Sequence, residues 1–324
     1  MTLKTQTKPK IKPAKKKDTS FDLIIIGGGP AGLTAALYAV RARVKVLLVE
    51  KMILGGMVST TFNIENYPGF PEGISGMELS NRFQDQVRRL GLDIVWGNAI
   101  EIKNKKSEKE IIVDDKKFIA KALIIATGTE AAKLGVPGED EFRGRGVSYC
   151  ATCDGAFYKD KKVMVVGGGN SAIEEALFLT RYAKKISVIH RRDELRADKI
   201  IAERAIQDPK IYFFWHSTVE KISGKQKVEE VTLKDTHSNK TLKVPADGIF
   251  VYIGSKPNNE LVKDIVKTDS HGFIITDENM KTSVNGIYAA GDIRVKSLKQ
   301  VVTAVADGAI AAESARKYIE GNDK

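Results

Sequence analysis

The 324-residue chain is 42% hydrophobic and 29% charged, which is typical of a globular protein with room for two domains of ordinary size. No apolar run reaches the roughly eighteen residues that a membrane helix requires, so we expect no membrane-spanning segment. The net charge of +11 is concentrated at the start of the chain, because residues 1–19 hold seven lysines and one aspartate and account for +6 of it.

Residues 1–19 are almost free of apolar side chains and contain two prolines, which predicts a disordered basic tail. The tail lacks the apolar core of a secretory signal and the arginines of an organellar transit peptide, so we expect a cytoplasmic protein. The modest charge of the remaining chain gives no strong reason to expect a nucleic-acid or membrane partner.

The first predicted unit begins with an apolar, β-branched run over 21–26, which indicates a buried parallel strand. The glycine-rich segment GGGPAG follows at 27–32, then an Ala/Leu-rich helix over 33–41 and a second strand over 44–49. Strand, glycine turn, helix and strand in this order form a dinucleotide-binding unit, with the pyrophosphate at the helix N-terminus. The full context makes the motif far more specific than GxGxxG alone.

Four residues of this unit are candidate nucleotide contacts. Gly27 permits the tight turn, Gly29 admits the pyrophosphate, and Gly32 lets helix and strand approach closely. Glu50 ends the second strand and can hold ribose hydroxyls. We therefore predict a nucleotide with a free 2′-hydroxyl here, such as FAD.

Two loops that follow are suited to a flavin site. Gly55, Gly56 and Met57 form a flexible loop just past Glu50, and Asn66 lies in a polar turn over 65–69. Each loop taken alone is an ordinary turn more often than a ligand contact.

The rest of the first part is predicted from periodicity. A surface helix is expected over 79–90, and strands over 94–119 with a solvated Lys/Glu-rich hairpin at 104–109. A buried strand over 122–126 then ends this part near Gly128.

Cys150 and Cys153 are the only cysteines, and Asp154 and a glycine follow them directly. Two intervening residues let the sulfurs meet in one turn, so the pair can open and close as a disulfide. Zinc is disfavoured, because it takes four ligands and the four histidines lie far off in sequence. A structural disulfide across so short a loop would stabilise little, so we predict redox chemistry and no metal.

The strand, glycine turn, helix and strand recur 140 residues after the first copy, over 162–166, 167–172, 173–182 and 186–189. In register with Glu50 and Lys51 of the first copy, the second has His190 and Arg191, followed by Arg192 and Arg196. Guanidinium groups bind a 2′-phosphate that a carboxylate would repel, so we predict NADP(H) here. The candidate contacts are Gly167, Gly169, Asn170, Ser171, Arg191, Arg192 and Arg196. A solvated basic loop is the alternative.

The last part is expected to begin with an antiparallel β appendage over 211–245 and a strand over 248–254, followed by a loop at 255–258. A strand over 286–290 then leads to Asp292, which can accept a hydrogen bond from a ribityl hydroxyl or serve only as a turn residue. The helix over 300–318 can place its N-terminus under a flavin.

From about Phe21 to Tyr318 the sequence resembles the low-molecular-weight bacterial thioredoxin reductases. The most specific element is CATCDG between GGGPAG and GGGNSAIEEA, followed by HRRDELRA and AAGD. The resemblance implies an α/β fold of two doubly wound, Rossmann-like domains with antiparallel β appendages, and a homodimer. An NADPH domain over 129–255 would carry the cysteines and be inserted into an FAD domain over 20–128 and 256–324.

The resemblance also implies residue roles. Cys153 would lie against the flavin, Cys150 would attack the disulfide of thioredoxin, and Asp154 would move protons. Further flavin contacts would lie within 50–57 and within 292–301, the second of which includes Lys299, Gln300 and Val301. Met57 and Lys299 depart from the glutamine and arginine that relatives often have, whereas the retained arginine motif favours NADPH over ferredoxin.

The expected reaction passes electrons from NADPH through FAD and the cysteine pair to thioredoxin. Because the cysteines and the NADPH motif share the inserted segment, we expect that segment to rotate about connections near 128–132 and 254–257. One alternative is a flavin disulfide reductase for another small dithiol protein, such as a glutaredoxin-like or peroxide-reducing partner. Another is a nucleotide-sensing interaction protein whose lysine tail docks on an anionic surface.

Overall fold

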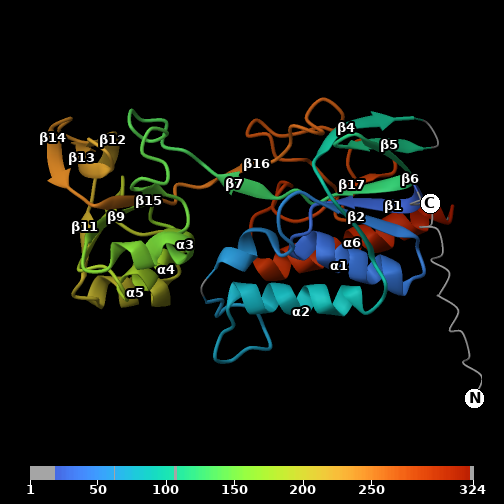
Figure 1. The fold of residues 1–324 in the computed structure, drawn as a ribbon, viewed down its shortest axis with the longest axis horizontal. Coiled ribbons are helices and arrows are strands. Elements are labelled where there is room, and N and C mark those ends of the chain that lie inside the picture. Colours follow the sequence, from blue (N-terminus) through green and yellow to red (C-terminus); the bar gives the residue numbers. More distant parts are fainter. Residues whose placement is uncertain (1–18, 62, 106–107, 322–324) are drawn as a thin grey trace, which may run out of the picture.

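The computed structural model describes residues 19–61, 63–105 and 108–321. They form two lobes joined by a narrow two-stranded ribbon (Figure 1). The predicted basic tail lies outside the described residues except for Thr19. None of the helices in the described ranges is long and apolar enough to span a bilayer.

The first lobe is built on a seven-stranded sheet with the order β3-β2-β1-β6-β5-β4, in which β17 also pairs with β6. The strands are β1 (Ser20–Ile26), β2 (Val46–Glu50), β3 (Asp93–Trp96), β4 (Ala99–Asn104), β5 (Lys109–Val113), β6 (Lys116–Ile125) and β17 (Ile287–Ala289). β1, β2, β3, β6 and β17 are parallel, so the C-terminal part of the chain returns to the sheet begun by the N-terminal part.

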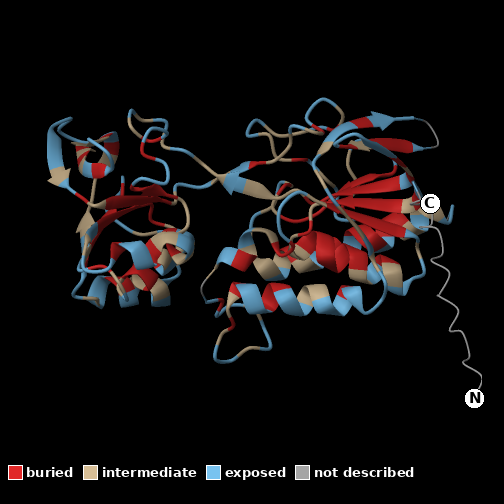
Figure 2. Ribbon diagram, in the orientation of Figure 1, coloured by how far each residue is buried: buried red, intermediate tan, exposed pale blue. Residues whose placement is uncertain are grey.

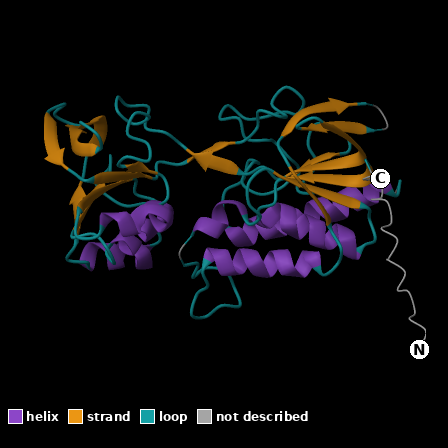
Figure 3. Cartoon of the chain, in the orientation of Figure 1, coloured by secondary structure: helices purple, strands orange, loops and turns teal. Residues whose placement is uncertain are grey.

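Helices cover one face of this sheet, and the β4–β5 hairpin together with irregular chain covers the other (Figure 3). The helices are α1 (Pro30–Arg41), α2 (Gly76–Arg88) and α6 (Val301–Ile319). α1 and α6 approach closely, since a side chain at Gly308 would meet the backbone of Ala31. Burial on both faces explains why the central strands are continuous apolar runs (Figure 2).

The second lobe has a parallel five-stranded sheet with the order β11-β10-β9-β15-β8. Its strands are β8 (Val147–Ser148), β9 (Lys162–Val166), β10 (Lys185–Ile189), β11 (Ile211–Phe214) and β15 (Gly248–Val251). The helices α3 (Ala151–Asp154), α4 (Asn170–Leu179) and α5 (Lys199–Gln207) belong to the same lobe. An antiparallel sheet of β12 (Ser217–Gly224), β13 (Val228–Asp235) and β14 (Thr241–Pro245) packs on the other face.

The ribbon between the lobes pairs β7 (Thr129–Ala131) with β16 (Ser255–Pro257) in antiparallel register. Two hydrogen bonds close its end at the first lobe: Thr127 Oγ1 donates to the Asn258 carbonyl at 2.8 Å, and Asn258 Nδ2 donates to the Thr127 carbonyl at 3.0 Å. Both chain connections are therefore tied to each other before they enter the second lobe.

The predicted α/β class with two nucleotide-type parallel sheets is confirmed, while several local predictions are wrong. Both helices that follow the glycine turns begin three residues earlier than expected, at Pro30 and Asn170. Proline suits the first position of a helix, because it has no N–H to leave unpaired and its φ is already helical.

Three further corrections concern strands. Residues 255–257 form β16 rather than a loop, and β11 belongs to the parallel sheet rather than to the antiparallel appendage. The expected solvated hairpin is also wrong in part, because Lys109 at its end is buried, with 2% exposure. Residues 106–107 of that hairpin lie outside the described residues.

Candidate redox and nucleotide sites

The first glycine turn leaves an open space before α1. Gly27 has φ of +106°, and a side chain there would collide with the Ala126 carbonyl. At Gly29, by contrast, an added Cβ would meet no heavy atom within 4 Å. α1 has no side-chain cap, so its first N–H groups face this space and fit a pyrophosphate.

Glu50 lies beside the turn, as its place at the end of β2 predicts. Its Oε2 accepts from the Gly28 N–H and its Oε1 from the Met52 N–H, both at 2.7 Å. These two backbone donors hold the carboxylate in one orientation, and its remaining lone pairs can accept from ribose hydroxyls.

The loop after Glu50 also reaches the turn. The Gly55 N–H donates to the Gly28 carbonyl at 2.8 Å, and a Cβ on Gly56 would lie 3.3 Å from the Gly29 Cα. The next residue, Met57 in η1 (Gly56–Thr60), is 57% exposed. The structure therefore brings Gly55 and Gly56 to the turn and leaves the Met57 side chain largely in solvent.

Segments from the C-terminal part of the chain also contribute to the candidate flavin site. Asn66 Nδ2 donates to Gln300 Oε1 at 3.2 Å, which joins the turn at 65–69 to the start of α6. Lys299 Nζ lies 3.1 Å from the centre of the Phe273 ring, and burial lowers the pKa of this lysine.

Asp292 has an unpaired acceptor that fits a ligand hydroxyl. Its Oδ1 is buried and accepts no hydrogen bond from any described residue, and Lys296 Nζ lies 3.7 Å away. Burial raises the pKa of Asp292 against the opposing effect of Lys296 and Lys299. A hydrogen bond from a hydroxyl of a bound ribityl chain would satisfy this oxygen.

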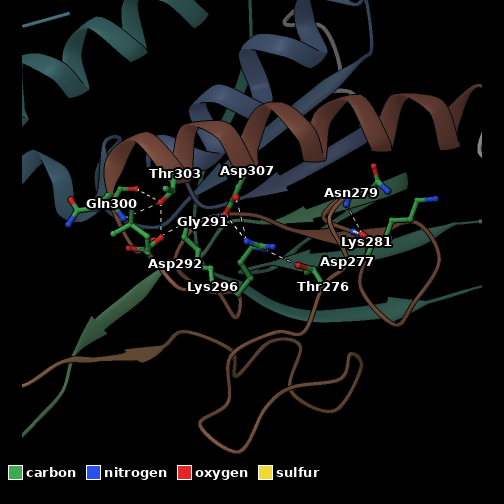
Figure 4. A network of polar contacts seen from close by, with 12 residues as sticks. Thr276, Asp277, Asn279, Lys281, Gly291, Asp292, Lys296, Gln300, Thr303 and Asp307 are labelled. Atoms are coloured by element: carbon green, nitrogen blue, oxygen red, sulfur yellow. Dashed lines mark hydrogen bonds and ion pairs between the residues drawn. The ribbon is translucent and has the colours of Figure 1, made fainter. Parts of the chain in front are cut away.

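Asp307 of α6 fixes the turn before Asp292 (Figure 4). Asp307 Oδ2 accepts from the Gly291 N–H and from Lys296 Nζ, both at 3.0 Å, and Arg294 Nη1 lies 3.5 Å from each of its oxygens. The three charged side chains are between 6% and 13% exposed. One carboxylate therefore pairs with two buried cations and anchors the Gly291 backbone.

The second glycine turn repeats the open space, because a Cβ on Gly169 would meet nothing within 4 Å. His190 takes the place that Glu50 has in the first copy, and its ring lies against Gly168. It is 5% exposed, its Nε2 has no hydrogen-bond partner among the described residues, and burial lowers its pKa.

The basic loop is tied to this turn through its backbone. The Arg196 N–H donates to the Gly168 carbonyl at 2.6 Å, while Asn170 and Asp198 exchange two hydrogen bonds at 2.7 and 2.9 Å. Arg191, Arg192 and Arg196 are exposed, and none of their guanidinium groups pairs with another described side chain. The loop therefore presents three available cations beside α4, where Ser171 is also exposed.

The disulfide joins Cys150 to Cys153 at the start of α3, with a Cα separation of 5.3 Å. Cys153 is exposed and Cys150 is half-buried. The Cys153 N–H points at Cys150 Sγ over 3.2 Å, a donor that would stabilise negative charge on that sulfur. The Tyr252 hydroxyl oxygen accepts from the Ala151 N–H at 2.7 Å and supports the loop from below.

Glu175 of α4 lies behind the disulfide loop. Its Oε2 is buried without a hydrogen-bond partner among the described residues. Burial and then the charge of Glu174 raise the pKa of Glu175 to about 7, against a smaller opposing effect of the Thr152 hydroxyl between the cysteines. No sequence motif marks Tyr252 or Asp307, and the GGGNSAIEEA string that contains Glu175 assigns it no role, since each acts through contacts that only the folded chain brings together.

Comparison with known proteins gives consistent matches. A family of pyridine nucleotide-disulphide oxidoreductases matches residues 21–308. The chain is 48% identical over 301 residues to a thioredoxin reductase of Bacillus subtilis strain 168, covering 93% of this chain and 95% of that one.

Two solved structures are each 45% identical to the chain and cover 99% of their own length. Lactococcus lactis thioredoxin reductase, in its FR conformation, gives a TM-score of 0.91 over 93% of this chain. The thioredoxin reductase of Streptococcus pyogenes MGAS5005 gives 0.63 over 94% of this chain. Equal identity with unequal TM-scores is what a different arrangement of two similar lobes produces.

We expect Asp307→Asn to lower the free energy of unfolding by about 3 kcal/mol, because it leaves Arg294 buried without a carboxylate and Lys296 with only Asp292, at 3.7 Å. Urea unfolding followed by tryptophan fluorescence measures the loss. Glu313→Gln is the matched control on the same helix, because its exposed pair with Arg316 contributes far less. Equal losses in the two variants would contradict the assignment.

Glu175 should make stability depend on pH. Its pKa is raised in the folded state, from 4.5 to about 7, so its favourable contribution is complete below about pH 4.5 and is lost as the pH rises through 7. Glu175→Gln should therefore raise the free energy of unfolding by about 2 kcal/mol at pH 8 and change it little at pH 5. A benefit of equal size at both pH values would rule out a buried, titrating carboxyl.

Proposed function

The chain belongs to the pyridine nucleotide-disulphide oxidoreductase family, and we propose that it acts as an NADPH-dependent, FAD-containing thioredoxin reductase. The observation that carries the proposal is the Cys150–Cys153 disulfide on the same lobe as the arginine-bearing glycine turn, with the carboxylate-bearing turn on the other lobe. A sensor or binding protein would have no use for this pairing. The family resemblance expected from the motifs is confirmed.

The first lobe has the groups that FAD requires. The open space before α1 would take the pyrophosphate, Glu50 the ribose, and Asp292 Oδ1 a ribityl hydroxyl. The start of α6 at Val301, with Lys299 and Gln300 before it, would lie beneath the flavin ring. When bound, the flavin supplies two-electron transfer between a nicotinamide and a disulfide.

The second lobe has the groups that select NADPH over NADH. The Gly169 turn and the start of α4 at Asn170 would bind the pyrophosphate, and the free guanidinium groups of Arg191, Arg192 and Arg196 the 2′-phosphate. A neutral imidazole at His190 avoids the repulsion that a carboxylate would cause at the same place.

The disulfide loop has the groups that a thiol exchange with thioredoxin requires. We assign attack on the partner's disulfide to Cys150, contact with the flavin to Cys153, and proton transfer to Asp154. Phe157 lies on η2 (Gly155–Tyr158), just after this loop, and is 74% exposed, which offers an apolar contact for the partner. A cytoplasmic homodimer is part of the proposal.

We further propose that residues 129–255 rotate as an inserted domain about the β7–β16 ribbon. The exposed Cys153 and the unequal TM-scores of two equally similar relatives support a second arrangement. In the arrangement seen here, Arg204 of α5 pairs with Glu65 across the lobes at 3.1 Å.

Cys150→Ser should abolish thioredoxin reduction and leave NADPH-dependent flavin reduction within about threefold of wild type, because only the exchange step loses its nucleophile. Anaerobic stopped-flow absorbance and an insulin-coupled thioredoxin assay measure the two steps. A glutaredoxin-like protein and a peroxide-reducing dithiol protein serve as competing substrates. Thioredoxin turnover by the serine variant would overturn the proposal.

Arg191→Gln combined with Arg192→Gln should reduce kcat/KM for NADPH by about tenfold to hundredfold and change that for NADH by less than about threefold. The reason is that these groups contact only the 2′-phosphate. Lys199→Gln removes a nearby charge from α5 while the arginines stay in place, and should leave the preference intact. Parallel losses for both nucleotides would contradict the assignment.

A further inference from the structure

Ser148, the last residue of β8, has a hydroxyl with three polar neighbours in the disulfide loop. Its Oγ lies 2.7 Å from Asp154 Oδ2, 3.1 Å from the Cys150 backbone nitrogen and 3.3 Å from the Cys150 carbonyl oxygen. The residue is 5% exposed, and β8 is held in the parallel sheet by its pairing with β15. Because the side chain is buried, the hydroxyl has little access to water and few possible partners besides these three groups.

A serine hydroxyl has one proton and two acceptor positions, so its hydrogen bonds can be counted. The Cys150 N–H donates to Oγ and uses one acceptor position. While Asp154 is ionised, the single hydroxyl proton goes to Oδ2, which is the closer and charged acceptor. The Cys150 carbonyl then keeps only the Asp154 N–H, which it accepts at 3.1 Å.

Protonation of Asp154 on Oδ2 reverses the direction of this contact. The carboxyl O–H now donates to Oγ and fills its second acceptor position, so the serine proton must turn to the Cys150 carbonyl at 3.3 Å. Every donor and acceptor of Ser148 is used in the protonated state, whereas one acceptor position of Oγ is unfilled in the ionised state. The hydroxyl therefore has two positions, and the charge of Asp154 selects between them.

We propose that Ser148 is a positioning residue that couples the protonation of Asp154 to the backbone of Cys150, in the disulfide exchange assigned under the proposed function. A reduced flavin, when bound, would supply two electrons and release its own proton to solvent, and the S–S bond would break to leave two thiolates. Cys150 takes the proton of Asp154 and becomes a thiol, and Cys153 stays a thiolate. Asp154 is again ionised, and the Ser148 proton turns back from the Cys150 carbonyl to Oδ2.

The other titratable groups around Asp154 do not take over the role of Ser148 in linking Asp154 to the Cys150 backbone. Tyr158 of η2 and Tyr252 after β15 face it, and burial, followed by nearby carboxylates, raises the pKa of both, so they stay protonated near neutral pH. Glu175 lies beyond Tyr252 and beside Thr152. Of these groups, Asp154 alone is hydrogen-bonded to the Ser148 hydroxyl.

The test is an infrared pH titration of the Asp154 carboxyl band in the oxidised holoenzyme, assigned by its loss in Asp154→Asn. Ser148→Ala removes a donor to the ionised form, so the carboxylate band should shift in frequency and the titration should differ from that of wild type. Electron transfer from flavin to the disulfide should slow about tenfold. Ser187→Ala is the matched control, because Ser187 is equally buried, at 5%, on β10 of the same sheet.

In the Asp154→Asn background, Ser148→Ala should cause no further slowing, because the coupling is already lost. An unshifted titration in Ser148→Ala would overturn the proposal, even if electron transfer were slow. Additive slowing in the double variant would do the same. Failure of the proposed function would show differently, as a wild-type protein whose flavin never reduces the disulfide, while the infrared titration would be unaffected.

Discussion

The pairing of β7 with β16 is the constraint on which the rest of the structure depends. Within the described residues, both chain connections between the lobes run through this ribbon, and the reciprocal hydrogen bonds of Thr127 and Asn258 close its end at the first lobe. The disulfide and the arginine-bearing turn both lie beyond it. Under the proposed function, these groups would reach their electron donor on the first lobe by movement of one lobe as a unit.

Charge distinguishes the two nucleotide sites that the repeat creates. In the first copy a carboxylate, Glu50, is held by two backbone donors at the end of β2. In the second a buried imidazole, His190, lies against the turn and unpaired guanidinium groups surround it. We therefore propose that the same backbone geometry binds a free ribose in one site and a phosphorylated one in the other.

Local patterns predicted much of the fold and located the two glycine turns at which the nucleotide sites are proposed. The strands over 21–26 and 162–166 are β-branched runs, and the glycine turns have their whole motif within six residues, so both could be recognised without tertiary information. Asp307, Ser148 and Glu175 could not, because their roles depend on Gly291, Asp154 and the disulfide loop, which the folded chain brings beside them. The prediction that Lys109 is solvent-exposed is wrong, because it rests on residue type alone and the folded chain buries this side chain. β16 is a three-residue strand whose pairing partner lies more than 120 residues earlier.

We propose that the lobe arrangement seen here changes within each catalytic cycle. Glu65→Cys with Arg204→Cys, joined by a short bis-maleimide while Cys150 and Cys153 remain disulfide-bonded, would lock this arrangement through the positions of the interlobe ion pair. Anaerobic stopped-flow absorbance would then follow flavin reduction by NADPH and its reoxidation by the disulfide. We predict that reduction persists and reoxidation stops. Full turnover of thioredoxin by the cross-linked protein would contradict the account.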